Sequence, residues 1–269
     1  MSPPNRPTAP RRVADTLSLA GRRALVTGAG RGLGREIALG LARAGARVAC
    51  AARTRFEIEA AAAECGPGAV AIELDVTSPE RVNAAVAAAQ AALGGIDILV
   101  NNAGAATSQP FRNLDLKTWR RVMATDLEGP FLVTQAVLPD MLGRDYGRVI
   151  MIGSMLSCAG RPYVAAYAAA KHGLLGLTRS LAAEYARSAV TFNCVCPAYA
   201  ATPMTQASIA NIVRVTGRSE QEARRSLHTP QDRLIEPAEV AAACVFLASA
   251  LSGSITGQAL MLDGGEIQA

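Results

Sequence analysis

The sequence is poor in aromatic and charged residues and contains only two histidines. Phe, Trp and Tyr make up 4% of its 269 residues, and Asp, Glu, Lys and Arg make up 18%, whereas hydrophobic residues make up 50%. This balance excludes a disordered chain and indicates a packed globular protein whose core is built from Ala, Val, Leu and Ile. Because no apolar run approaches the length of a membrane span, we expect no association with a membrane.

The sequence also lacks a basic run interleaved with aromatic residues, which is the pattern that binds nucleic acid. The net charge is +5, but the arginines are spread along the chain. We therefore expect no nucleic-acid partner. A mild positive field is instead suited to phosphate-bearing small molecules or to an acidic carrier.

The six cysteines show no zinc-binding spacing, so we expect no metal site. Cys50, Cys194 and Cys196 fall in apolar runs typical of buried strands. The alternation of Cys194 and Cys196 predicts that their side chains project to the same side of a strand. We expect reduced thiols in a cytoplasmic protein.

The N-terminal 19 residues differ in composition from the rest. They contain four prolines and three arginines, and the prolines prevent the amphipathic helix of a transit peptide. We expect residues 1–19 to form a flexible arm that packs on a neighbouring subunit, and residues 20–269 to form one domain.

Short apolar runs alternate with helical segments from residue 22 onward. The expected strands are 23–27, 47–52, 69–74, 96–100, 148–152, 190–195 and 259–262, and the expected helices are 32–44, 56–64, 79–93, 115–143, 164–187 and 237–249. This alternation predicts a single α/β domain of the doubly wound, Rossmann type, with a seven-stranded parallel sheet covered by helices on both faces. The polar segment 203–230 interrupts the pattern and predicts a helical lid over the site.

A glycine-rich turn, TGAGRGLG at residues 27–34, follows the first strand and opens the first helix. In an open α/β sheet this position holds the pyrophosphate of a dinucleotide at a helix N-terminus. Gly28 permits the tight turn, Gly32 lets the backbone approach phosphate, and Gly34 lets the helix pack on the strand. Glycines also simply make turns, so the strand–turn–helix context carries this prediction.

The end of the second strand distinguishes the two nicotinamide cofactors. An acid there accepts the ribose 2′-hydroxyl of NAD, whereas an arginine accommodates the 2′-phosphate of NADP. The strand is followed by Arg53, Thr54 and Arg55, and Arg31 lies in the glycine turn. Two guanidinium groups can converge on one phosphate, so we expect NADP(H) rather than NAD(H). The alternative is that Arg53 and Arg55 are solvated loop charges.

Tyr167 and Lys171 are four residues apart in an Ala-rich stretch, so they share one helical face. A lysine ammonium beside a phenol lowers the tyrosine pKa from about 10 towards working pH, which suits Tyr167 to proton transfer. Ser154 ends an apolar run, where its hydroxyl can hydrogen-bond a substrate oxygen. By spacing alone, however, a Tyr–Lys pair is far more often an ordinary pair of helix-surface neighbours.

Taken together, these pieces resemble the short-chain dehydrogenase/reductase family over about residues 22–265. The motifs are the glycine turn, LDV at 74–76, NNAG at 101–104, Ser154, and Tyr167 with Lys171. The resemblance implies that Ser154 polarises a substrate carbonyl, Tyr167 delivers the proton, and Lys171 holds the cofactor ribose. It implies a cofactor site made of Gly28, Arg31, Gly32, Leu33, Gly34, Arg53, Thr54, Asp75, Val76, Asn102, Ala103, Gly104, Tyr167, Lys171, Pro197 and Thr202.

Two positions depart from the family pattern. Ala198 stands where the family usually has Gly. Asp126, in TDLEG at 125–129, stands where the family has a catalytic Asn. A carboxylate only accepts hydrogen bonds, whereas an amide also donates them. We expect Asp126 to take the catalytic position of that Asn, with activity retained and the pH optimum shifted.

The resemblance implies NADPH-dependent reduction of a ketone to a secondary alcohol, with Tyr167 as general acid. The expected substrate is a 3-oxoacyl thioester, bound to a carrier or to coenzyme A, or a polyketide-type or cyclic ketone. The alternatives are an NAD-dependent secondary alcohol dehydrogenase and a non-catalytic NADP-binding protein. The resemblance also implies a homotetramer that associates through helices 115–143 and 164–187.

Overall fold

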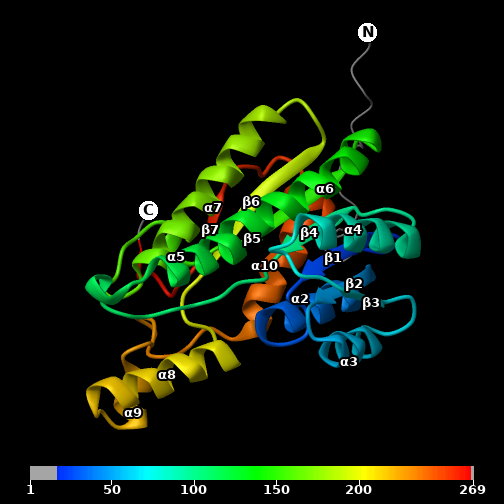
Figure 1. The fold of residues 1–269 in the computed structure, drawn as a ribbon. Coiled ribbons are helices and arrows are strands. Elements are labelled where there is room, and N and C mark those ends of the chain that lie inside the picture. The colour runs from blue at the N-terminus through cyan, green and yellow to red at the C-terminus, as the bar shows by residue number, and fades with distance from the viewer. Residues whose placement is uncertain (1–16, 268–269) are drawn as a thin grey trace.

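A parallel sheet forms the centre of the computed structural model, which describes residues 17–267; most of the expected N-terminal arm lies outside them. Within this part of the chain the sheet has seven strands in the order β3-β2-β1-β4-β5-β6-β7 (Figure 1). The strands are β1 (Arg23–Thr27), β2 (Arg47–Ala52), β3 (Val70–Glu73), β4 (Ile98–Asn101), β5 (Gly147–Ile152), β6 (Val190–Pro197) and β7 (Ala259–Leu262). Every neighbouring pair is parallel, which confirms the predicted Rossmann-type sheet.

Helices cover both faces of this sheet. One face packs against α2 (Gly32–Arg43), α3 (Arg55–Cys65) and α10 (Pro237–Ala248). The other packs against α4 (Pro79–Leu93), α6 (Gly129–Gly143) and α7 (Ala165–Glu184). The strand order reverses between β1 and β4, and a crevice for ligands opens beyond the carboxyl ends of the strands at such a point.

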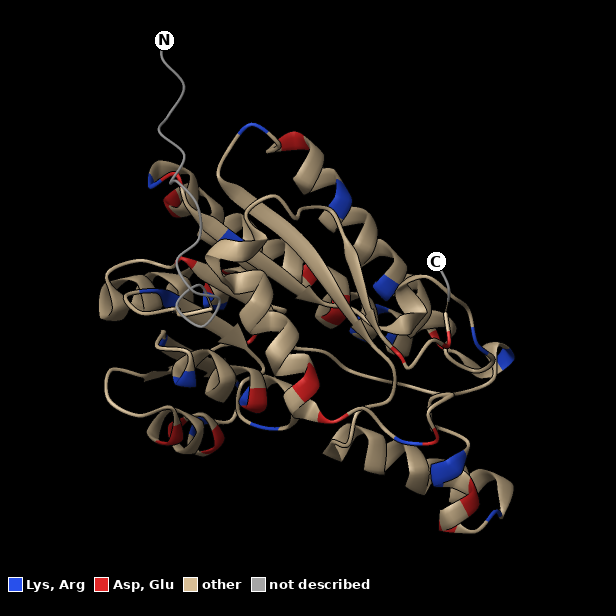
Figure 2. Cartoon of the chain, turned by 180° about the vertical axis from the view of Figure 1, so that it is seen from behind, with Lys and Arg blue, Asp and Glu red and all other residues tan. Residues whose placement is uncertain are grey.

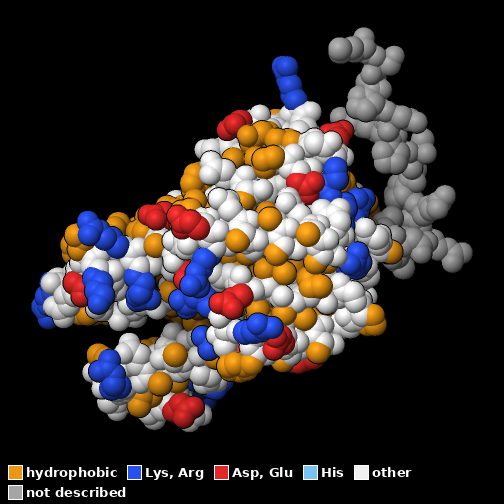
Figure 3. Space-filling model, turned by 45° about the vertical axis from the view of Figure 1, so that its right-hand side comes forward, with side chains coloured by type: hydrophobic (Ala, Val, Ile, Leu, Met, Phe, Trp, Pro, Cys, Tyr) orange, Lys and Arg blue, Asp and Glu red, His pale blue; other side chains and the backbone are white. Residues whose placement is uncertain are grey.

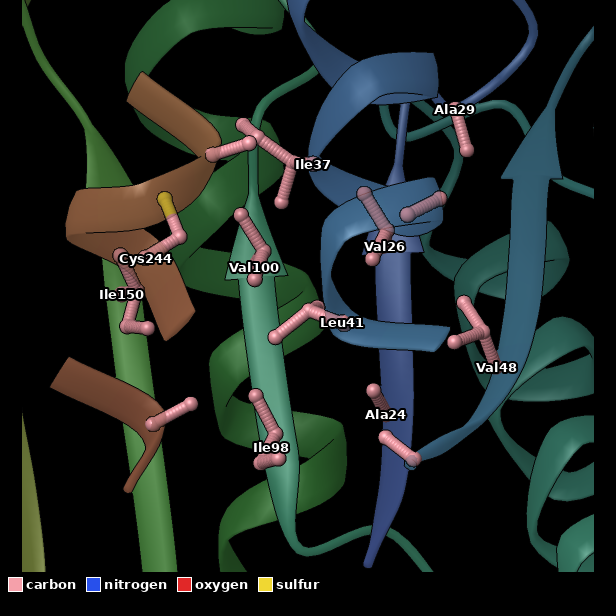
Figure 4. Packing of buried hydrophobic residues seen from close by; sticks show 14 of the residues in the cluster. Ala24, Val26, Ala29, Ile37, Leu41, Val48, Ile98, Val100, Ile150 and Cys244 are labelled. Carbon is pink, nitrogen blue, oxygen red and sulfur yellow. The ribbon is translucent and has the colours of Figure 1, made fainter. Parts of the chain in front are cut away.

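The core consists of small and aliphatic side chains, as the scarcity of aromatics predicts. Figure 4 shows the layer under α2, where Ile37 and Leu41 lie against Val26 of β1 and Val100 of β4, with Cys244 of α10 beside them. All five are fully buried. Side chains of this size let α2 and α10 approach the sheet and each other closely.

Local signals fix where the helices begin and end. Helix α4 begins after Ser78, whose hydroxyl accepts the backbone N–H of Arg81 at 3.3 Å, and Pro79 occupies its first turn. It ends at Gly94, which adopts the left-handed conformation with φ of 81°. Such a cap satisfies backbone groups that the helix itself leaves unpaired.

The segment predicted as one helix over 115–143 is interrupted. It consists of α5 (Leu116–Met123), a π-helical turn η2 (Ala124–Glu128) and α6. Pro130 has no N–H to give to the carbonyl four residues before it, so regular α-helical bonding cannot continue there. The extra residue of a π-turn accommodates this break, and such turns often occur at functional sites.

Helix α5 packs on the first turns of α7. Val122 and Trp119 of α5 join Ala166, Ala170 and Tyr167 of α7 in a small cluster. This contact places α5 beside the segment that carries the expected Tyr–Lys pair.

The predicted lid is helical and forms a lobe of its own. Helices α8 (Pro203–Thr216) and α9 (Glu220–Arg225) project from the body (Figure 1), and Figure 3 shows a deep hollow between two lobes on one side of the molecule. The lobe has a separate core of Ile209, Ala223, Leu227 and Leu234. An isolated β-bridge between Ala200 and Ile235 joins its two ends.

The surface carries both signs of charge. Seen from behind, acidic and basic residues are interspersed over the helices and loops (Figure 2). Among residues 17–267, no helix combines the length and the apolar character needed to cross a bilayer.

Gly34→Ala should destabilise the protein, because the added Cβ would clash with the carbonyl oxygen of Gly28. We expect urea unfolding to show a loss of about 1–3 kcal/mol in the free energy of unfolding, the usual cost of overpacking. Gly143→Ala is the control: apart from its chain neighbours and its own helix backbone, no described residue lies within 4 Å of its added Cβ, so stability should stay the same or rise by about 0.5 kcal/mol. Equal midpoints for the two variants would contradict the packing argument.

Candidate active site

The motifs from separate parts of the chain meet at one edge of the sheet. The glycine turn follows β1, the NNAG segment ends β4 and continues beyond it, Ser154 follows β5, and the segment 197–202 begins at the last residue of β6. Parallel strands present their carboxyl ends at the same edge, so each motif occupies one wall of the crevice.

The glycine turn fits a dinucleotide pyrophosphate. Gly28 and Gly32 have φ of 67° and 57°, a conformation that favours glycine. A Cβ on Gly28 would lie 2.8 Å from Nδ2 of Asn102, so a side chain would displace the neighbouring loop. Helix α2 begins here without a side-chain cap, and its first N–H groups are therefore available to an anion.

Thr27 joins β1 to the loop after β4, a role that the sequence reasoning missed. Its Oγ1 accepts the backbone N–H groups of Asn102 and Ala103, both at 3.0 Å. Asn102 in turn donates from Nδ2 to the carbonyl oxygens of Thr27 and Gly28, at 2.9 and 3.2 Å. The position of Thr27 at the exact end of the first strand, next to the glycine turn, was the only signal in the sequence.

Asn101, the first residue of NNAG, points away from the crevice. It is 2% exposed, and its Nδ2 donates to Oγ1 of Thr134 at 2.9 Å. At this strand, Asn102, Ala103 and Gly104 remain the residues expected to line a cofactor site.

Two of the arginines expected to hold a 2′-phosphate lie near carboxylates. Arg55 lies in the first turn of α3 and pairs with Glu59 at 2.8 Å. Arg31 lies 3.6 Å from Glu57, so neither guanidinium is free of a carboxylate. Arg53 has no ion-pair partner among the described residues and is exposed. The convergence of two guanidinium groups on one phosphate stays a prediction, and α3 supplies glutamates to two of the three arginines.

Asp75 and Val76 follow β3 beside this region. Burial raises the pKa of Asp75, but hydrogen bonds from the backbone N–H and the hydroxyl of Thr77 outweigh that effect and lower it. These bonds, at 3.0 and 2.8 Å, fix the Asp75 carboxylate. Val76 is buried against Gly129, whose added Cβ would lie 2.8 Å from it.

Ser154 opens the short helical turn η3 (Met155–Ser157) and is itself held by it. Its Oγ accepts the backbone N–H of Leu156 at 3.2 Å, and Oγ of Ser157 accepts the N–H of Ser154 at 3.2 Å. This reciprocal arrangement fixes the direction of the Ser154 hydroxyl. Its proton remains available for donation to another oxygen.

Tyr167 and Lys171 share a face of α7, as their spacing predicts. The Nζ of Lys171 lies 5.5 Å from the Tyr167 ring centroid and donates to the carbonyl oxygen of Ile152 at 2.9 Å. Burial raises the pKa of Tyr167, and this outweighs the lowering by the Lys171 ammonium and by hydrogen bonding from Ser154. Lys171 thus lowers the pKa of Tyr167 as its spacing predicts, but burial, which spacing does not report, makes the net shift upward.

Asp126 lies in the π-turn η2 and faces Lys171. It is fully buried, and its Oδ2 lies 3.5 Å from Nζ of Lys171. Burial raises the pKa of Asp126 against the attraction of Lys171. For Lys171, burial lowers the pKa but Asp126 and Tyr167 outweigh it, so the pKa rises and Lys171 stays an ammonium.

The segment that follows β6 reaches the glycine turn. Ala198 is not among the residues with positive φ, so the Cβ that replaces the expected Gly causes no backbone strain. Thr202 caps α8 by accepting the N–H of Thr205 at 3.4 Å. It also lies over the glycine turn, 3.7 Å from an ideal Cβ on Gly32. Pro197 ends β6 just before this segment.

Comparisons with known proteins agree with this arrangement. The family model described as short chain dehydrogenase matches residues 22–212. A 3-oxoacyl-(acyl-carrier-protein) reductase from Vibrio cholerae is 38% identical over 249 residues, which cover 93% of this chain and 98% of the relative. A gluconate 5-dehydrogenase from Gluconobacter oxydans is 37% identical over 93% of this chain and 96% of its own.

A solved structure gives the same result for the fold. The crystal structure of an actinorhodin polyketide ketoreductase variant with NADPH aligns with a TM-score of 0.87 at 35% identity, over 95% of this chain and 98% of that one. The likeness therefore extends over nearly the full length of both chains.

Thr27→Val should destabilise the crevice, because it removes the acceptor of two backbone N–H groups. We expect a loss of about 1–3 kcal/mol in the free energy of unfolding for the unsatisfied groups, and faster hydrogen exchange at Asn102 and Ala103. Thr27→Ser keeps the hydroxyl and should retain the wild-type exchange rates. If Val and Ser variants exchange equally, the Thr27 hydroxyl does not hold this loop.

Proposed function

This chain belongs to the short-chain dehydrogenase family, and on that premise we propose that it reduces a ketone to a secondary alcohol with NADPH. The family match and the names of the relatives support the conclusion that this protein is an oxidoreductase acting on CH–OH and C=O groups. The observation that carries the finer proposal is the grouping of a hydroxyl, a phenol and an ammonium beside the glycine turn. Ser154 is close enough to Tyr167 to act on its pKa by hydrogen bonding, and Lys171 lies on the same helix face.

Each of the three groups has a role in this reaction. NADPH supplies the hydride when it is bound. Ser154 donates a hydrogen bond to the carbonyl oxygen and orients the substrate. Tyr167 gives its proton to that oxygen as negative charge develops on it, and its raised pKa keeps it protonated beforehand. Lys171 remains an ammonium and stabilises the phenolate that is left behind.

The residues at the end of β2 favour NADPH over NADH. Ala52 is followed by Arg53, and no acid stands there to accept a ribose 2′-hydroxyl. Arg53 is exposed and forms no salt bridge among the described residues, although its charge lowers the pKa of Asp75. Glu57, near Arg31, works against a 2′-phosphate, so Arg53 carries most of the proposed preference.

The substrate is proposed from the named relatives and from the lid. One relative is named as acting on an acyl-carrier-protein thioester, and one solved structure is a polyketide ketoreductase. We propose a 3-oxoacyl thioester, on a carrier or on coenzyme A, or a polyketide-type or cyclic ketone, covered by α8 and α9. We also propose a homotetramer formed through α5, α6 and α7, where Leu116 and Phe131 are exposed at 59% and 43%.

Tyr167→Phe tests the proposed reaction. We expect kcat for reduction of a β-keto ester by NADPH to fall at least about 100-fold, the usual contribution of a general acid. Tyr163→Phe is the control, because Tyr163 is exposed and lies outside α7, and its kcat should stay at the wild-type value. If the wild type consumes no NADPH with β-keto esters or acyl thioesters and oxidises secondary alcohols with NAD instead, the proposed function is wrong.

Arg53→Ala tests the cofactor preference. The wild type should have a kcat/KM for NADPH above that for NADH, and the variant should lose this preference because the guanidinium facing the 2′-phosphate is gone. Arg55→Ala should keep the preference, since Arg55 is paired with Glu59. A wild-type ratio below one would refute the assignment to NADPH.

A further inference from the structure

We propose that Asp126 keeps Tyr167 in its protonated phenol form by neutralising the charge of Lys171. The site is then fitted to give a proton to a carbonyl, and it cannot remove one from an alcohol until the solution is alkaline. This inference rests on the proposed function and adds to it the direction in which the site works. It concerns the residue that replaces the Asn expected in this family.

The geometry holds the carboxylate of Asp126 in place on both sides. Its Oδ1 accepts the backbone N–H of Ala105 at 2.7 Å, so the carboxylate cannot rotate away. Its Oδ2 is buried and faces Nζ of Lys171 at 3.5 Å. Gly104 lies directly beside it, since an added Cβ there would be 3.3 Å from Oδ2. Asp126 itself is fully buried, so water does not screen this pair.

Charge explains why this pairing matters for Tyr167. An amide at position 126 would leave Lys171 as an uncompensated positive charge next to the phenol, which favours phenolate. With a carboxylate there, the negative charge of Asp126 offsets part of the effect of the Lys171 ammonium at the phenol. Accordingly, Lys171 lowers the pKa of Tyr167 while Asp126 raises it, and burial adds a larger raising effect.

Other titratable groups also face this pair. Arg121 of α5 acts on Asp126 and lowers its pKa, and Tyr199, with Arg161 near it, acts on Tyr167. From β6, Cys194 and Cys196 lie with their Sγ atoms 3.6 Å apart and face Lys171. All of these groups are unchanged by substitution of Asp126, so a comparison of variants isolates the carboxylate.

The proton balance differs between the two directions. In reduction, the phenol O–H of Tyr167 breaks, its proton forms the alcohol O–H, and hydride from NADPH completes the C–H bond. In oxidation, the phenolate must take the hydroxyl proton while hydride passes to NADP. A site that holds Tyr167 as a phenol therefore has the acid for reduction in place and little of the base for oxidation.

Asp126→Asn tests the proposal through two measurements on the full-length protein. The first is the pH profile of oxidation of a secondary alcohol by NADP, and the second is titration of tyrosinate absorbance in the free protein, with Tyr167→Phe identifying the relevant step. We expect both midpoints to fall by about one pH unit or more in the Asn variant. As pH rises, the rate of reduction should also begin to fall at a lower pH in the Asn variant, because the Tyr167 phenol loses its proton at a lower pH.

Asp145→Asn is the matched control, since it makes the same chemical change at an exposed residue. Asp145 has φ of 49°, a conformation that Asn tolerates, so its midpoints should equal those of the wild type. If the Asn variant at position 126 does not fold, Asp126→Ser removes the same charge and should shift the midpoints in the same direction.

Unchanged or higher midpoints in the variants at position 126 would overturn the inference. A protein that reduces no ketone would instead overturn the proposed function. The absorbance titration needs no substrate, so it still decides whether Asp126 governs the ionisation of Tyr167.

Discussion

The junction between β1 and β4 fixes the geometry on which the site depends. At the start of these strands, Asp97 accepts from the backbone N, Nε and Nη2 of Arg23 at 3.0, 2.8 and 2.7 Å. Burial raises the pKa of Asp97, but its bonds to Arg23 outweigh this and lower it, so the carboxylate remains charged. At the other end, the Thr27 hydroxyl joins β1 to Asn102. Because both ends are held, the distance between the glycine turn and the NNAG wall is set before any ligand arrives.

Most of the sheet and several of the site residues could be predicted from the sequence. Buried parallel strands are short apolar runs, and the glycine turn is a local backbone motif, so both depend on neighbouring residues alone. Contacts between distant side chains could not be predicted. Thr27 and Asn102 are 75 positions apart, and the glutamates that pair with Arg31 and Arg55 both come from α3. The direction of the pKa shift of Tyr167 depends on burial, which no spacing reveals.

The π-turn η2 determines where Asp126 points. Regular α-helical bonding is broken at Pro130, and the turn changes the register of α5 relative to α6. Asp126 then faces Lys171, while Leu127 packs against Gly173 of α7, where an added Cβ would lie 2.8 Å from it. This backbone irregularity thus turns the Asp126 carboxylate towards α7. In an uninterrupted α-helix, the same side chain would point in another direction. The bias of the site towards proton donation follows from this local winding as much as from the residue type.

The scarcity of aromatic residues has a consequence for observing this protein. Trp119 is the only tryptophan of the chain, and it packs with Val122, Ala166 and Tyr167 where α5 meets α7. All indole fluorescence therefore comes from one place, next to the helix that carries the proposed acid. Reduced nicotinamide absorbs where indole emits, so energy transfer from Trp119 reports occupancy of the crevice as it happens. The unlabelled protein carries its own optical probe.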